Sequence, residues 1–239
     1  MGYMISRRFF CLFALLWVTS LAVVLSVPAE ESEVYGSSIL QDPWSFPKNG
    51  GDLWENPRAV FFKTDVVHTE DGKKWIRTQQ DIMGIFPVSL DSFYRLFLDF
   101  STYPQFMPRM VRCTLLSIQD GRIFDVQNRY EVNILGYRYP TEYQLQFRVE
   151  KYAEDRMAIR WHLLSSDGTV GGAEGGWFLE TIETGRGPGT IVRNLNVSLI
   201  RQDFPLQVQI MNLVGAGELE GMFRSIYKEI LRRRKTGST

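Results

Sequence analysis

The sequence is poor in the residues that carry most metal and catalytic chemistry. Its 239 residues include only two histidines and two cysteines. No HExxH or CxxC motif occurs, so a metal centre is not expected. The serine motif G-x-S-x-G is absent as well, and we predict no catalytic residue. These absences favour a non-enzymatic protein without a cofactor, with an enzyme as the alternative.

The sequence also lacks an excess of charge of either sign. Lys and Arg total 27, Asp and Glu also total 27, and the net charge is zero. Without a global positive field, nucleic acid is not an expected partner. Hydrophobic residues nevertheless make up 44% of the chain and aromatic residues 13%. This composition allows a large hydrophobic core and argues against a disordered chain.

The first 29 residues have the pattern of an export signal. Arg7 and Arg8 precede an uncharged run of 19 residues, 9–27, and small residues follow it. This order is typical of a cleaved secretory signal peptide over residues 1–29. The run is nearly long enough to span a bilayer, so an uncleaved anchor is the alternative. We expect an exported protein that is periplasmic, secreted or membrane-anchored. Cleavage would leave only Cys113, which excludes an internal disulfide.

The rest of the chain divides into an extension, one domain and a short tail. Residues 30–57 show no period and predict an irregular N-terminal extension, whose Trp44, Phe46 and Trp54 could pack onto the domain. Residues 58–235 carry regular patterns and predict one domain, and residues 236–239 form a tail.

The domain begins with strand patterns and a short helix. Two β-rich runs, 59–67 and 75–86, flank the hairpin signal Asp71-Gly72. Residues 89–100 then repeat apolar side chains at helical spacing, and Ser89 is suited to cap that helix.

Six further β-rich runs follow between residues 111 and 201. Alternation is clear in residues 139–151, where one face is apolar and the other polar. The apolar face there comprises Tyr139, Tyr143, Leu145, Phe147 and Val149. This alternation predicts an antiparallel sheet with one covered face.

A long helix is predicted after Pro205. Apolar residues recur there at steps of three and four: Leu206, Ile210, Leu213, Leu219, Met222, Phe223, Ile226 and Ile230. Gly215 and Gly217 would let this helix pass close to the sheet or leave room for a ligand. The basic end, residues 232–235, could contact anionic lipid headgroups, but a solvated helix end is the favoured interpretation.

The order of these elements resembles the helix-grip fold of the START-like, or SRPBCC, superfamily, over roughly residues 75–233. The segment Tyr103-Pro104-Gln105-Phe106-Met107-Pro108 looks most like the coenzyme Q-binding and polyketide cyclase-like branch. The glycine-preceded strand "GGWFLETI" and the strand "GTIVRNLNV" also fit the superfamily. The resemblance implies an α+β fold, with a curved antiparallel sheet of about six to eight strands wrapped around the C-terminal helix. Short helices would follow the first strands.

The resemblance further implies an apolar cavity between the sheet and the last helix. Tyr103, Phe106 and Met107 would lie at its mouth, with plain core as the alternative. The remaining expected lining residues are Asn128, Tyr130, Tyr139, Tyr143, Phe147, Trp161, Trp177, Met211, Gly215 and Met222. Asn194 and Asn196 could face inward or outward, depending on the strand register.

The leading hypothesis is a non-enzymatic binding or carrier module for a hydrophobic small molecule, such as a lipid or quinone. A cyclase or aromatase-type enzyme is one alternative. An envelope interaction protein with a filled core is another. Peripheral membrane contact is compatible with the basic helix end, and the sequence leaves the oligomeric state open.

Overall fold

The computed structural model describes residues 42–46, 53, 57–68, 72–134, 137–185 and 187–237. The expected signal peptide, Trp54 and Asp71 lie outside these residues. Among the described helices, none is both long and apolar enough to cross a membrane.

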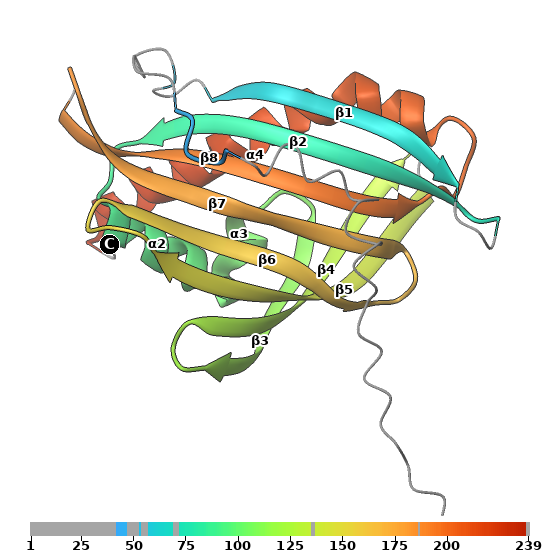
Figure 1. Cartoon of the computed structure of the whole chain (residues 1–239), viewed down its shortest axis with the longest axis horizontal. Helices are drawn as coiled ribbons and strands as arrows, with labels where there is room; N and C mark the ends of the chain where they lie inside the picture. The colour runs from blue at the N-terminus through green and yellow to red at the C-terminus, as the bar shows by residue number, and fades with distance from the viewer. Residues whose placement is uncertain are drawn as a thin grey trace, which may run out of the picture.

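The fold is built on one eight-stranded antiparallel sheet with the order β1-β2-β8-β7-β6-β5-β4-β3. Figure 1 shows this order from β1 at one edge to β3 at the other. The strands are β1 (Arg58–His68), β2 (Lys74–Phe86), β3 (Met110–Gln119), β4 (Ile123–Ile134), β5 (Tyr137–Lys151), β6 (Arg156–Ser166), β7 (Val170–Thr184) and β8 (Gly187–Arg201). The expected number of strands and their antiparallel pairing are confirmed.

The helices lie on one face of this sheet, which we call the helix face; the opposite face is the outer face (Figure 1). They are α2 (Leu90–Leu98), the 3-10 turn η3 (Phe100–Thr102), α3 (Tyr103–Phe106) and α4 (Gln207–Thr236). Ser89 caps α2 as predicted, because its side chain accepts a hydrogen bond from the Ser92 amide. Helix α2 packs on β7 and β8, whereas α4 runs along β1 and β2.

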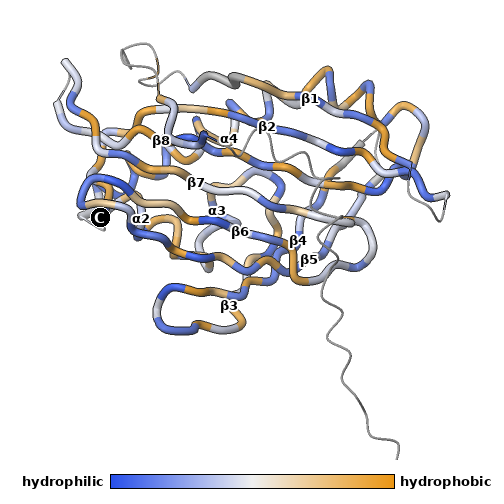
Figure 2. The backbone as a smooth tube through the Cα atoms, viewed as in Figure 1, coloured by the Kyte–Doolittle hydropathy of each residue, from blue (hydrophilic) through white to orange (hydrophobic). Residues whose placement is uncertain are grey.

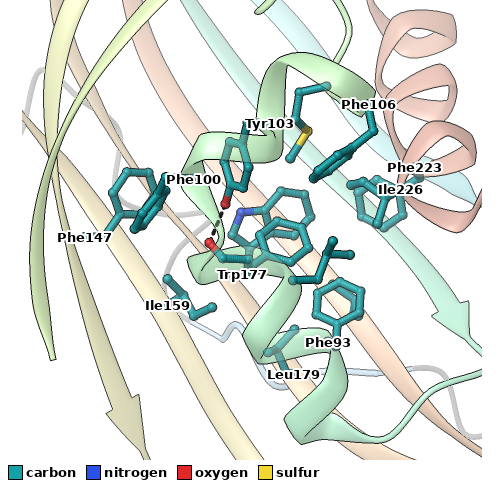
Figure 3. Packing of buried hydrophobic residues seen from close by; sticks show 14 of the residues in the cluster. Phe93, Phe100, Tyr103, Phe106, Phe147, Ile159, Trp177, Leu179, Phe223 and Ile226 are labelled. Atoms are coloured by element: carbon teal, nitrogen blue, oxygen red, sulfur yellow. Dashed lines mark hydrogen bonds between the residues drawn. The ribbon is translucent and has the colours of Figure 1, made fainter. Parts of the chain in front are cut away.

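The main core lies between the helix face and these helices. Alternating hydrophilic and hydrophobic residues along the strands supply one apolar side chain every second position (Figure 2). Figure 3 shows aromatic side chains from α2, α3, α4 and the sheet meeting in one cluster. Within it, Trp177 lies 4.5 Å from Phe97 and 5.6 Å from Phe223 between ring centroids. Close packing of this kind dominates the stability of a domain.

The outer face is also partly covered, which the sequence interpretation of one covered face did not foresee. Trp44 and Phe46 pack against buried residues of β6, β7 and β8, as expected for those two aromatics. The ring of Trp44 lies 5.5 Å from that of Phe178. The Arg193 guanidinium donates hydrogen bonds to the main-chain oxygens of Asp42 and Ser45 in this segment. The N-terminal extension is therefore part of the domain at residues 42–46.

The predicted stripe on α4 is correct only in its second half. Leu219, Phe223, Ile226 and Ile230 are buried, but Leu206 is 62% exposed and Leu213 is 85% exposed. The helix also begins at Gln207, after Pro205. A helical period fits several faces of so long a helix, and the contact with β1 selects a face that excludes Leu213.

The interpretation of residues 232–235 as a solvated helix end is wrong for Arg233. Its side chain is only 14% exposed and pairs with Glu229 at 2.8 Å and Asp99 at 3.0 Å. Arg233 also donates a hydrogen bond to the Thr102 hydroxyl at 2.7 Å. These contacts tie the end of α4 to the turn between α2 and α3.

Candidate functional site

The helix face divides into two regions that differ in packing. The packed region lies beneath α2, α3 and the second half of α4. It contains the fully buried residues Phe86, Phe93, Phe97, Phe100 and Phe223, together with Trp177. The half-exposed region lies toward the first half of α4 and strands β3–β6. It contains Tyr130, Tyr143, Trp161 and Leu163, together with Met222 at the middle of α4, which are only partly buried although they pack against the core.

The three residues expected at a cavity mouth lie in the packed region. Tyr103 is 5% exposed, and Phe106 and Met107 are each 8% exposed. The Tyr103 hydroxyl donates a 2.6 Å hydrogen bond to the main-chain oxygen of Phe97 (Figure 3). This structure therefore places all three in the core, which was the alternative interpretation. Their role as an entrance stays a prediction.

The half-exposed region arises from the path of the first half of α4. An added Cβ at Gly215 would overlap the ring of Phe62, so the helix can approach β1 this closely only with glycine here. One turn earlier, the Thr64 hydroxyl donates a 2.7 Å hydrogen bond to the side chain of Asn212. Both contacts hold α4 along β1. On the helix face of β4 and β5, toward the other end of the sheet, Tyr130 and Tyr143 are only partly buried.

A polar group is buried on the helix face of β4. Asn128 is 3% exposed and pairs across the sheet with Cys113 of β3 and Tyr143 of β5. Its neutral amide can both donate and accept hydrogen bonds.

Two tyrosines stand beside Asn128. The rings of Tyr130 and Tyr143 are stacked, with centroids 5.8 Å apart and an interplanar angle of 2°. Their hydroxyls hydrogen-bond to each other, and burial raises the pKa of both. Burial also raises the pKa of the Cys113 thiol to about 12. All three groups are thus uncharged at neutral pH.

A second polar row crosses β2 and β8 on the helix face. Its members are Thr78, Gln80, Asn194, Asn196 and Ser198. The Thr78 hydroxyl is buried and has no hydrogen-bond partner. The register places Asn194 and Asn196 on the same face as the buried Val192, so the inward alternative is correct. Sequence analysis did not identify Thr78 and Gln80. Their positions, two residues apart between Ile76 and Ile82, would have placed them on the same face as those two residues.

The remaining predicted lining residues occupy both regions. Phe147 and Trp177 are buried, and the ring of Trp161 lies 6.0 Å from the first and 6.3 Å from the second. Met211 is partly exposed on α4, one turn before Gly215. Tyr139 lies 5.9 Å from Phe204, the residue that leads from β8 toward α4. The members of the predicted set therefore differ in exposure, and Tyr139 and Met211 lie outside the main core cluster.

An ion pair lies at the edge of the half-exposed region. Arg109, between α3 and β3, binds Glu218 of α4 at 2.7 Å, and both side chains are 43% exposed. This pair connects the turn after α3 to the first half of α4.

Two other kinds of site are not supported. A crevice between Leu53, Pro57, β2 and α4 has a volume of only about 10 Å³, room for a single water molecule. In the part of the chain that the structure describes, no group of His, Cys, Asp and Glu side chains could hold a metal ion. His162 is exposed on the outer face, as its alternation with Trp161 predicted.

Comparison with known proteins identifies the fold. No family model and no curated protein sequence matches the chain. Among solved structures, human StAR-related lipid transfer protein 5 has a TM-score of 0.54 at 10% identity, over 86% of this chain and 97% of that one. The STAR-related lipid transfer protein from Xanthomonas axonopodis has a TM-score of 0.53 at 15% identity, over 70% of this chain and 98% of that one. Together with the single sheet and long C-terminal helix, these matches show that the chain has the helix-grip fold of the START-like superfamily.

Proposed function

We propose that this protein is a non-enzymatic binding or carrier module for a hydrophobic small molecule, such as a lipid or quinone. The ligand would lie between the half-exposed region and the first half of α4. The observation that carries the proposal is the incomplete burial of Tyr130, Tyr143, Leu163 and Met222 within the core. Aromatic and aliphatic side chains in such a position gain free energy when an apolar ligand displaces water, at about 25 cal/mol per Å².

The structural neighbours support the same class of ligand. Two of the solved structures with this fold are lipid transfer proteins by name. Because their identity to this chain is low, they support the proposal only through the fold.

The chemistry of the half-exposed region favours binding over catalysis. Among its described residues, the titratable groups are tyrosines and Cys113, and burial raises the pKa of Cys113, Tyr130 and Tyr143. A general acid or base works best when its pKa lies near the working pH. These groups would therefore orient a ligand and exchange few protons with it.

Native mass spectrometry of the protein purified gently from its own cells tests the proposal. We expect an adduct that organic extraction removes and whose mass indicates the ligand class. A clean apo mass, with no uptake from a mixture of lipids and quinones, would contradict the proposal and favour an interaction protein with a filled core.

A matched pair of variants would locate the ligand. Leu163 faces the core, whereas its neighbour Leu164 is 43% exposed. Leu163→Trp should fill space on the helix face and reduce uptake of the ligand. Leu164→Trp adds the same side chain elsewhere and should leave uptake unchanged. Equal uptake by both variants would place the ligand outside the half-exposed region.

Export is a separate part of the proposal. It rests on Arg7, Arg8 and the uncharged run that follows them. N-terminal sequencing of the protein from fractionated cells would test it. A protein that starts near residue 30 and is found outside the cytoplasm supports a cleaved signal. A full-length protein in the membrane fraction supports an anchor, and a full-length cytoplasmic protein contradicts export.

A further inference from the structure

The helix face carries no charged side chain over most of its described length. In six strands, every second residue lies on the helix face. These residues run from Ile76 to Phe86 in β2, Phe124 to Val132 in β4, Tyr139 to Val149 in β5, Met157 to Leu163 in β6, Ala173 to Leu179 in β7 and Thr190 to Ile200 in β8. All of these residues are uncharged. The buried residues of α4 between Gly215 and Ile226 are uncharged as well, and the next buried residue, Glu229, is already paired with Arg232 and Arg233.

An ionised ligand group would find no opposite charge on this surface. Burial of a charge without a partner costs much more than burial of a neutral polar group. Arg109 and Glu218, at the rim on the α4 side, already neutralise each other.

Neutral hydrogen-bonding groups are nevertheless present on this face. The Asn128 side chain is almost completely buried. It offers two N–H donors and a carbonyl acceptor. The paired hydroxyls of Tyr130 and Tyr143 stand on the same wall, since Asn128 and Tyr143 are cross-strand neighbours. When one tyrosine donates to the other, the second hydroxyl keeps its own proton for another acceptor.

We propose that the ligand carries an uncharged oxygen group, a carbonyl or a hydroxyl, on a hydrophobic body, and that Asn128 and the Tyr130–Tyr143 pair bind this oxygen. The inference rests on the proposed function and narrows its ligand class. It excludes ligands whose buried end is a carboxylate, a phosphate or an ammonium group. The apolar body supplies the affinity, and the oxygen fixes the orientation.

A series of ligands with one chain and different ends tests this class. Decane, decanol, methyl decanoate, decanoate and decylamine would each compete with Nile red, an uncharged fluorescent probe, on the full-length protein at neutral pH. We expect decanol and methyl decanoate to bind about tenfold more tightly than decane, the effect of one net hydrogen bond. Decanoate and decylamine should bind more weakly than decanol.

Variants of Asn128 separate the contribution of its amide to ligand affinity from that of the apolar wall. Asn128→Leu keeps the volume and replaces the amide with an apolar side chain in a largely apolar core, so the fold should be retained. In this variant the preference for decanol over decane should fall to about twofold or less. Tyr143→Phe removes one hydroxyl and should weaken the same preference. Gln127→Leu is the matched control, because Gln127 lies one residue away on the outer face of β4, and the preference should not change.

The outcomes distinguish this inference from the proposed function. Tight binding of decane and decanol with no difference, or tighter binding of decanoate, would overturn the inference and leave a hydrophobic binding module. An unchanged preference in both Asn128→Leu and Tyr143→Phe would also overturn it. Failure of Nile red and every ligand to bind would overturn the proposed function itself.

Discussion

The packed and half-exposed regions of the helix face share a sheet and a helix, yet only the packed region is fully buried. In the packed region α2 and α3 insert between the sheet and α4, and side chains such as Phe97, Trp177 and Phe223 meet at ring distances of 4.5 to 5.6 Å. In the half-exposed region none of the described short helices is inserted, and α4 lies against β1 through Gly215 and Phe62. The same helix thus closes one region and leaves the other incompletely covered.

One part of α4 therefore contributes mainly to stability, and another part is available for binding. Close packing in the first region holds α4 in place. The second region can then present apolar and neutral polar groups without collapsing onto them. Variants that alter one region can therefore be compared with variants that alter the other.

Removal of a large side chain from the packed region should have the largest effect. Trp177→Ala should lower the free energy of unfolding by about 3 to 5 kcal/mol, because it leaves a cavity between α2 and α4. Leu163→Ala in the half-exposed region should cost less, about 1 kcal/mol. Urea denaturation of both variants measures the two values. Equal losses would show that the two regions are packed alike.

The position of α4 over the half-exposed region depends on one glycine. At Gly215 an added methyl group would overlap the Phe62 ring, so Gly215→Ala should destabilise the protein by about 1 to 3 kcal/mol. At Gly217 an added Cβ meets no atom within 4 Å. Gly217→Ala should therefore stabilise the helix by about 0.5 to 1 kcal/mol.

Denaturation midpoints of the two variants give this comparison directly. A change of the same sign in both would contradict the close approach of α4 to β1. Gly215→Ala should also change ligand uptake, since the helix must shift away from β1, whereas Gly217→Ala should not.

The sequence predicted the local features of both regions. The cap at Ser89 and the alternation in β5 depend on neighbouring residues, and both are confirmed. Burial of Cys113 on a strand is likewise confirmed. Such patterns are visible because each element must place its apolar residues on one side.

The division into two regions could not be predicted, because it depends on contacts between distant residues. Leu213 fits the helical period of α4, but the contact between Gly215 and Phe62 turns Leu213 to solvent. Tyr103 was open to two interpretations, as an entrance or as core. Its burial depends on Phe97, Phe100 and Phe106 closing around it, and on where α4 lies.

Alkaline pH should test the half-exposed wall with a smaller effect. Burial raises the pKa of Cys113 to about 12, whereas the pKa of a cysteine in an unfolded chain is about 8.5. Between these values the unfolded chain binds fewer protons than the folded one, so stability should fall as the pH rises above about 8.5. Cys113→Ala should lose part of this slope in urea titrations at increasing pH.

The slope of Cys113→Ala also separates this thiol from the tyrosines. Tyr103, Tyr130 and Tyr143 have raised pKa values too, and they should keep a decline that begins near about pH 10. An identical pH dependence in both proteins would show that the Cys113 thiol is accessible to water.

The smallest stability change should come from the ion pair at the rim. Glu218→Gln removes the contact with Arg109, and because both side chains are 43% exposed the loss should be below about 1 kcal/mol. The pair nevertheless joins the turn after α3 to α4 at the edge of the half-exposed region. Its loss should therefore speed the exchange of Nile red in stopped-flow measurements.

The control is Asp91→Asn, which breaks the exposed pair with Arg95 on α2 and should change neither stability nor exchange appreciably. Equal exchange rates in the two variants would mean that ligands do not enter beside Arg109, and Tyr103, Phe106 and Met107 would then be tested as the entrance.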